Sequence, residues 1–170
     1  MNAQEPLWTP SRQSVDAAVV TDFARHCSKR YGADVADYDR LHAWSITERA
    51  QFWDAIWDFC GVKGDKGGTL LDNGDAMPGA RFFPEARLNF AENLLSVTGA
   101  QDAIVFRGED KVQTRMSWDQ LHALVSRLQQ AMRALGVTTG DRVAAMMPNM
   151  PEAIAAMLAA TSIGAIWSSC

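Results

Sequence analysis

Apolar residues recur about every four positions in two stretches near the start of the chain. In residues 14–31 this spacing gives one apolar side of an α-helix, and Gly32 follows where a left-handed residue commonly ends a helix. In residues 45–60 the same spacing follows Ser45, and Glu48 three places on completes the Ser-x-x-Glu spacing of a capping box. We therefore predict two helices, one ending at Gly32 and one beginning at Ser45, with their apolar sides in a core.

Residues 61–79 break this pattern because glycine and aspartate are frequent in them. Such a stretch does not pack as helix or strand, so we predict an exposed loop. A glycine-rich loop binds phosphate when it contains Gly-x-x-x-x-Gly-Lys-Ser/Thr or Gly-x-Gly-x-x-Gly between a strand and a helix. Neither pattern occurs and no strand pattern precedes the loop, which favours a solvated linker over a phosphate site. Pro84 then ends any regular element, and a short helix is predicted in residues 88–95.

From residue 103 the pattern changes to that of a mixed helix and strand fold. Residues 103–107 and 111–116 have the composition and alternation of two hairpin strands. Ser117 and Gln120 then have capping-box spacing, and the apolar residues that follow keep a 3.6-residue period up to Gly136. We predict a hairpin followed by one long amphipathic helix.

Two further strands are predicted around another helix. Residues 143–147 form an apolar run typical of a strand buried on both faces of a parallel sheet, Pro151 suits the first turn of a helix, and residues 163–169 form a second strand pattern. Alternation of strand and helix indicates right-handed crossovers. The predicted fold class is α/β: a helical N-terminal cap followed by a hairpin and β-α-β crossovers of a domain that is incomplete at residue 170.

Charge and composition argue against several partners. Sixteen basic residues are scattered among twenty acidic ones, with a formal net charge of −4, so we expect no nucleic acid and no anionic membrane as partner. Residues 153–167 are apolar but shorter than the about 20 residues of a membrane span, and residues 1–10 lack the pattern of a signal peptide. Cys27, Cys60 and Cys170 are far apart and odd in number, which disfavours disulfides and favours a reducing cytoplasm.

The sequence offers no catalytic constellation. His26, His42 and His122 lie on separate segments without metal-ligand spacing, so no metal site is predicted. No Gly-x-Ser-x-Gly motif occurs, and no cysteine has a nearby basic partner that would activate it. Composition and spacing alone therefore indicate an α/β segment without a complete active site.

Several short phrases along the chain have a distinctive wording and order. In order they are Pro-Leu-Trp-Thr-Pro at 6–10, Phe-Phe-Pro-Glu-Ala-Arg-Leu-Asn-Phe-Ala-Glu-Asn-Leu-Leu at 82–95, Gly-Asp-Arg-Val at 140–143, Met-Pro-Asn-Met-Pro-Glu-Ala at 147–153, and Ser-Ile-Gly-Ala-Ile-Trp-Ser-Ser at 162–169. Together they resemble the N-terminal part of the acetoacetyl-CoA synthetases. The phrases at 140–143 and 147–153 are shared across the adenylate-forming acyl-CoA synthetases, whereas those at 82–95 and 166–169 are typical of the acetoacetate branch.

The resemblance implies a two-step ligation. The carboxylate of acetoacetate attacks the α-phosphate of ATP with Mg²⁺ present, pyrophosphate leaves, and the thiol of CoA attacks the acyl-adenylate. The implied cofactors are ATP, CoA and Mg²⁺; acetate, propionate or another short acid stays an alternative because the family builds its acyl pocket further along the chain. The ATP-binding loop and the catalytic Lys of the family are also absent from these 170 residues, so we expect this part alone to be inactive and to hold no cofactor.

The resemblance also implies a division of the chain and a place for two residues. It assigns residues 1–96 to the N-terminal cap and residues 97–170 to the beginning of the AMP-binding domain. In related acetyl-CoA synthetases, contacts to the CoA nucleotide begin just after the strand matched by residues 163–170, so Ser169 and Cys170 are expected at the rim of that site; alternatively they only end a buried strand. A hypothesis of another class is a non-catalytic interaction module that pairs its unfinished sheet edge with another chain.

Overall fold

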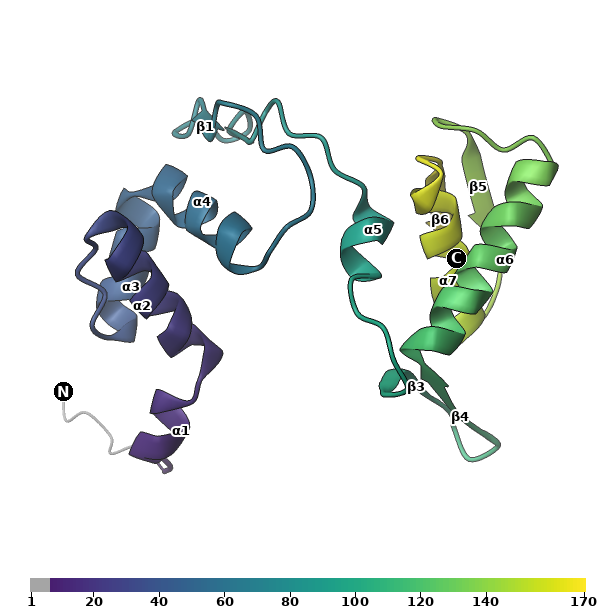
Figure 1. The fold of residues 1–170 in the computed structure, drawn as a ribbon, viewed down its shortest axis with the longest axis horizontal. Coiled ribbons are helices and arrows are strands. Elements are labelled where there is room, and N and C mark those ends of the chain that lie inside the picture. The colour runs from purple at the N-terminus through teal and green to yellow at the C-terminus, as the bar shows by residue number, and fades with distance from the viewer. Residues whose placement is uncertain (1–6) are drawn as a thin grey trace. The chain divides into compact units, whose positions relative to one another are not determined.

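The computed structural model describes residues 7–170, and the chain divides into two compact units between Arg87 and Leu88 (Figure 1). The first unit contains α1 (Arg12–Asp16), α2 (Val19–Tyr31), α3 (Tyr38–Thr47), α4 (Arg49–Phe59), β1 (Leu71–Asp72) and β2 (Arg81–Phe82). The second unit contains α5 (Phe90–Leu94), β3 (Asp102–Gly108), β4 (Val112–Ser117), α6 (Trp118–Ala134), β5 (Arg142–Ala145), α7 (Pro151–Ser162) and β6 (Ile166–Ser169).

The first unit has an aromatic core between α2 and α4. The ring of Phe23 on α2 lies edge-on to Phe52 and Phe59 of α4, with centroids 5.8 and 5.2 Å apart. Edge-to-face contacts of this kind add to the stabilisation that burial of the rings provides. Cys27 and Ala55 are fully buried in the same cluster, so the two helices approach closely.

The helix predicted for residues 14–31 is two helices. α1 ends at Asp16, α2 begins at Val19, and Ala18 between them has an extended backbone with φ −75° and ψ 137°. The predicted end is confirmed: Gly32 is left-handed with φ 65°, and its N–H donates to the carbonyl of Ser28. The predicted apolar side is buried only in its C-terminal half.

The prediction that a helix begins at Ser45 is wrong. Asp37 caps α3 instead, accepting a 2.9 Å hydrogen bond from the backbone N–H of Arg40. Ser45 therefore lies inside a helix that is already formed, and its hydroxyl donates back to the carbonyl of His42 at 2.7 Å. The chain bends after α3 and continues as α4 from Arg49.

Residues 61–79 are largely an exposed loop, as predicted, but they are attached to the rest of the first unit. β1 pairs antiparallel with β2, and a separate bridge joins Asp65 to Arg87 through two 2.8 Å backbone hydrogen bonds. Arg49 on α4 donates to the carbonyl of Gly74. The expectation of a solvated linker is therefore wrong, because the loop is held at several points.

The hairpin and the capped helix of the second unit are confirmed. β3 pairs antiparallel with β4, and Glu109 takes a left-handed φ of 52° in the turn between them. The Ser117 hydroxyl accepts from the N–H of Gln120 at 3.2 Å, and the Gln120 side chain accepts from the N–H of Ser117 at 2.8 Å. Both bonds of the capping box are thus present at the start of α6.

β5 and β6 form the predicted parallel pair, joined by α7. Pro151 occupies the first turn of α7, as expected. Two expectations differ from the structure: β4 and β5 belong to separate two-stranded sheets, so they are not linked by a crossover within one sheet, and Ala144 of β5 is exposed, so β5 is not covered on both faces. A parallel strand needs partners on both faces, which the described residues do not supply here.

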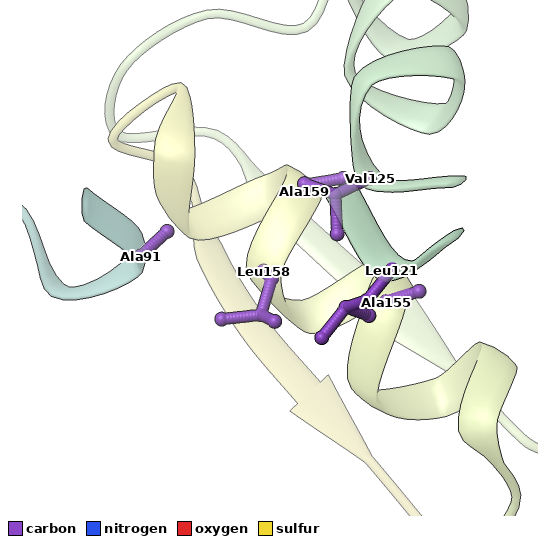
Figure 2. Packing of buried hydrophobic residues seen from close by; sticks show 6 residues of the cluster. All are labelled: Ala91, Leu121, Val125, Ala155, Leu158 and Ala159. Carbon is purple, nitrogen blue, oxygen red and sulfur yellow. The ribbon is translucent and has the colours of Figure 1, made fainter. Parts of the chain in front are cut away.

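The core of the second unit lies where α6 meets α7 and α5 (Figure 2). Leu121 and Val125 of α6 pack against alanines of α7, and these small side chains let the two helices approach each other closely. The cluster thereby fixes α7, the element between the two parallel strands. Its buried members are Ala91, Leu121, Val125, Ala155, Leu158 and Ala159.

Candidate functional site

The carboxyl ends of β5 and β6 lie side by side in the second unit. Because the strands are parallel, Ala145 at the end of β5 is the register partner of Ser169 at the end of β6. Open α/β sheets bind their ligands at this edge. We call the residues just past the two strand ends, Met146–Met150 together with Ser169 and Cys170, the strand-end site.

Backbone hydrogen bonds continue past both strands and order the strand-end site. The N–H of Cys170 donates to the carbonyl of Ala145, and the N–H of Met147 donates to the carbonyl of Cys170, each at 3.1 Å. Ser169 and Cys170 are both exposed, and these hydrogen bonds hold the backbone of Cys170 beside β5.

The strand-end site presents three exposed polar side chains. Asn149 is exposed and adds an amide to the hydroxyl of Ser169 and the thiol of Cys170. All three groups can hydrogen-bond to a polar ligand. Glu152 in the first turn of α7 counters the positive end of the helix dipole, so the helix start does not favour an anion.

Asp141 of the Gly-Asp-Arg-Val phrase lies at the opposite, amino end of β5. Its carboxylate accepts from the N–H of Thr138 at 2.7 Å and from the Thr138 hydroxyl at 2.9 Å. These bonds hold the pKa of Asp141 below its ordinary value. The carbonyl of Asp141 accepts from the N–H of Ile166 at 2.7 Å, so this residue begins the pairing of β5 with β6 and has a structural role.

The glycine-rich loop of the first unit binds an internal carboxylate. Glu85 accepts from the N–H groups of Gly68 and Thr69 at 2.8 and 3.2 Å and from the Thr69 hydroxyl at 3.2 Å. The hydrogen bond from Gly68, and to a smaller extent those from Thr69, hold the pKa of Glu85 below its ordinary value. Because Glu85 occupies the amides that a phosphate would use, the loop offers no phosphate site.

A charge cluster in the first unit was not found from the sequence. Asp54 is 8% exposed, and its carboxylate accepts from Lys66 at 2.5 Å, from the Tyr31 hydroxyl at 2.5 Å and from Arg30 at 2.9 Å. Lys66 also lies 2.7 Å from a carboxylate oxygen of Asp58. Asp54 and Asp58 are four residues apart on the apolar helix α4, which is the one sequence signal that would have singled them out.

Burial and pairing act in opposite directions on the titration of this cluster. Burial favours the neutral form of Asp54, but the hydrogen bonds from Lys66 and Tyr31 and the nearby positive charges outweigh it, so the pKa of Asp54 lies below its ordinary value. Burial is the largest cause and the hydrogen bond to Asp54 the next, and together they raise the pKa of Tyr31 to about 12. The pKa of Lys66 is raised because its bonds to the two carboxylates outweigh burial. Asp54 and Lys66 are therefore both charged at neutral pH, the Tyr31 phenol stays protonated, and the Asp54–Lys66 contact ties the loop to α4.

The three histidines lie in different surroundings. His26 is half-buried with its ring 5.6 Å from that of Phe59, His42 stacks on Tyr38, and the ring of His122 bonds to a backbone carbonyl 2.8 Å away. Within residues 7–170 no group of three His, Cys, Asp or Glu side chains is placed to hold a metal ion. In the same range, no helix combines the length and apolar character needed to span a membrane.

Two protein families match adjacent parts of the chain. "Acetyl-coenzyme A synthetase N-terminus" matches residues 38–94, and "AMP-binding enzyme" matches residues 95–170. The two matches together contain all the short sequence phrases that resemble the acetoacetyl-CoA synthetases, except the phrase at residues 6–10. Pro6 of that phrase lies outside the described residues.

Curated relatives and a solved structure match nearly the whole chain. It is 60% identical over all 170 residues to an acetoacetyl-coenzyme A synthetase of Rhizobium meliloti, and 37% identical over 98% of its length to the malonamoyl-CoA synthetase vrtB of Penicillium aethiopicum. It superposes on acetoacetyl-CoA synthetase from Streptomyces lividans with a TM-score of 0.88 at 35% identity, over 98% of the chain.

These matches cover only part of the relatives. The chain spans 26% of the Rhizobium meliloti protein, 24% of the Penicillium aethiopicum protein and 26% of the Streptomyces lividans chain, about a quarter in each case. The family match at residues 38–94 identifies that quarter as the N-terminal one. The chain belongs to the adenylate-forming acyl-CoA synthetases, and it corresponds to the N-terminal region of the acetoacetyl-CoA synthetases within that family.

Proposed function

We propose that this chain is the N-terminal part of an acid–thiol ligase that converts acetoacetate, ATP and CoA to acetoacetyl-CoA, AMP and pyrophosphate through an acyl-adenylate. The observation that carries the proposal is the 60% identity to an acetoacetyl-coenzyme A synthetase, which extends over all 170 residues. A relative named for malonamoyl-CoA is 37% identical, and acetoacetyl-CoA synthetases of Xenopus tropicalis and Danio rerio are 33% and 34% identical, so identities at this level do not separate the acids. Acetoacetate is proposed ahead of acetate or propionate because the 60% identical relative is named for it.

The two units have separate roles in this proposal. Residues 1–96 are the N-terminal cap, and residues 97–170 begin the AMP-binding domain. The family matches change at residues 94 and 95, and the compact units divide between Arg87 and Leu88, both close to this boundary. We further propose the cytoplasm as the location, since ATP and CoA are available there.

The residues that the structure describes, 7–170, do not fit Mg²⁺ or the phosphates of ATP. The glycine-rich loop is occupied by Glu85, and within residues 7–170 no acidic cluster has the arrangement of a metal site. No step of the adenylation is therefore assigned to these residues. Ser169 and Cys170 are proposed as rim contacts for the nucleotide part of CoA, because they are exposed, ordered and at the carboxyl edge of parallel strands.

The test begins with the reading frame beyond the codon for Cys170. A product that includes any further coding sequence is assayed for pyrophosphate release with ATP and a panel of acetoacetate, acetate and propionate, and for thioester formation with CoA. Acetoacetate as the best substrate by kcat/KM supports the proposal. Higher activity with another acid means that the substrate is that acid, while the family assignment stays. A stop codon at residue 171 favours the alternative of a non-catalytic interaction module.

A further inference from the structure

Four successive backbone carbonyls at the end of α7 and in the turn after it have hydrogen-bond partners: those of Thr161, Ser162, Ile163 and Gly164. The last carbonyls of a helix have no partner within the helix, so other groups must satisfy them. The side-chain amide of Asn89 donates to the carbonyl of Thr161 at 3.0 Å and to that of Ser162 at 3.4 Å. The Thr139 hydroxyl donates to the carbonyl of Ile163 at 2.9 Å. The carbonyl of Gly164 accepts from the N–H of Gly140 at 3.0 Å, and the carbonyl of Thr161 also accepts from the N–H of Gly164 at 3.0 Å.

Asn89 serves two helices at once. Its side-chain oxygen accepts from the N–H of Glu92 at 3.1 Å and caps the start of α5, while its side-chain NH₂ donates to the end of α7. Aspartate would keep the cap but lose the donor, and serine would keep the cap but is too short to supply a second bond. Asparagine is thus required because one short side chain must both accept and donate.

The position of this turn determines the position of the strand-end site. Only residues 163–165 separate α7 from β6, and Ala165 among them is buried, so the backbone has little slack. β6 is four residues long and its register with β5 runs from Ile166 to Ser169. A change in where α7 ends therefore changes where Ser169 and Cys170 lie.

We propose that Asn89 is a positioning residue for the strand-end site: its side-chain amide fixes the end of α7 and thereby the placement of Ser169 and Cys170. The inference rests on the proposed function for its consequence, which is that Asn89 sets the affinity for CoA without touching it.

The test compares three variants of the full-length enzyme that contains this chain. Asn89→Asp removes the donor to α7, Thr139→Val removes the neighbouring donor with little change of shape, and Ser117→Ala is the control because it removes a cap from α6 and leaves the turn intact. Two steady-state assays are run on each: acetoacetate-dependent ATP–pyrophosphate exchange, which reports adenylation, and thioester formation at varied CoA. Amide hydrogen exchange of residues 163–170 is measured in parallel.

Asn89→Asp and Thr139→Val are expected to raise the KM for CoA by roughly fivefold, with adenylation changed less than about twofold. Ser117→Ala is expected to leave both reactions unchanged. An unchanged KM for CoA in Asn89→Asp overturns the inference whatever Thr139→Val does. A parallel loss of both reactions in all three variants also overturns it, because that would indicate a general loss of stability.

Failure of the proposed function is separable from failure of this inference. If the unaltered enzyme shows no CoA-dependent reaction, the proposed function is wrong. Amide hydrogen exchange then tests by itself whether Asn89 positions residues 166–170. Faster exchange at residues 166–170 in Asn89→Asp and Thr139→Val, but not in Ser117→Ala, supports it. Equal exchange in all of them overturns it.

Discussion

The ammonium group of Lys66 lies 2.5 Å from a carboxylate oxygen of Asp54, which joins the glycine-rich loop to the buried side of α4. The two side chains are 20% and 11% exposed, and Lys66 also lies above the ring of Trp57 at 5.7 Å from its centroid. Removing one member of such a pair leaves the other charge poorly solvated, so this contact determines how firmly the loop is held.

Lys66→Met is therefore expected to lower the free energy of unfolding of the first unit by about 1–3 kcal/mol. The measurement is urea unfolding followed by tryptophan fluorescence, to which Trp57 beneath the ammonium contributes. Arg25→Met is the matched control, since its partner Asp22 and Arg25 itself are more than half exposed. We expect the control to cost less than about 1 kcal/mol. Equal effects of the two substitutions would contradict the importance of the buried cluster.

The same cluster predicts how the stability of the first unit depends on pH. The pKa of Asp54 is lowered in the folded chain, so its contribution is present above the ordinary value of 3.8 and is lost as pH falls through the lower folded pKa. The pKa of Lys66 is raised, so its contribution is complete below 10.5 and is lost as pH rises through the folded pKa. The pKa of Tyr31 is raised from 10.0 to about 12, so folding is also weakened in that interval.

The urea midpoint of the first unit should thus be flat from about pH 5 to 9 and fall on both sides. Tyr31→Phe removes the phenol, so its alkaline loss should begin at a higher pH, in the range where Lys66 titrates. An alkaline limb that is the same with and without the phenol would show that Tyr31 does not contribute to it.

The sequence contains two capping-box spacings, of which Ser117 caps a helix and Ser45 does not. The difference comes from the residues that precede each serine. Ser117 follows an alternating strand, so the backbone before it is extended and its hydroxyl is free to cap α6. Ser45 follows residues that are themselves compatible with a helix, and Asp37 upstream has already capped that helix. The spacing alone does not distinguish these cases, because the cap also requires an extended residue before the helix.

The periodic elements of the second unit were predictable because their signals are local. The hairpin, α6, α7 and the parallel pairing of β5 with β6 all follow from period, turn residues and Pro151. The contacts that join distant segments were not predictable, since Asp54 and Lys66 are 12 residues apart and Asn89 is 72 residues from Thr161. Ser169 and Cys170 came from family resemblance, and their role as CoA contacts stays a proposal.

Gly67 lies where the glycine-rich loop passes closest to Glu85. Its φ is +74°, and a Cβ placed there would lie 2.6 Å from the Cβ of Glu85. Gly67→Ala therefore combines backbone strain with a steric clash against a side chain that is itself held by three hydrogen bonds. Gly61 is the matched control because its φ is +61° and nothing lies within 4 Å of an added Cβ.

Both substitutions to alanine should cost about 1–2 kcal/mol from the left-handed backbone, and Gly67→Ala should cost more than Gly61→Ala because of the clash. Urea unfolding of the two variants measures the difference. Faster amide exchange at Gly68 and Thr69 in Gly67→Ala would show that Glu85 has been displaced. Equal stability of both variants would mean that the loop moves away from Glu85 at little cost.

The three cysteines differ in exposure, and this difference predicts their reactivity. Cys27 is fully buried in the core of the first unit, and burial raises the pKa of its thiol, so the reactive thiolate is scarce there. Cys60 follows α4 and Cys170 follows β6, and both are exposed. Iodoacetamide should therefore modify Cys60 and Cys170 under native conditions and Cys27 only when the first unit unfolds. Peptide mass spectrometry of samples taken over time measures each rate, and the rate at Cys27 should rise with urea along the same curve as tryptophan fluorescence.

Modification of Cys27 as fast as that of Cys60 in native buffer would show that the contact between α2 and α4 opens without global unfolding.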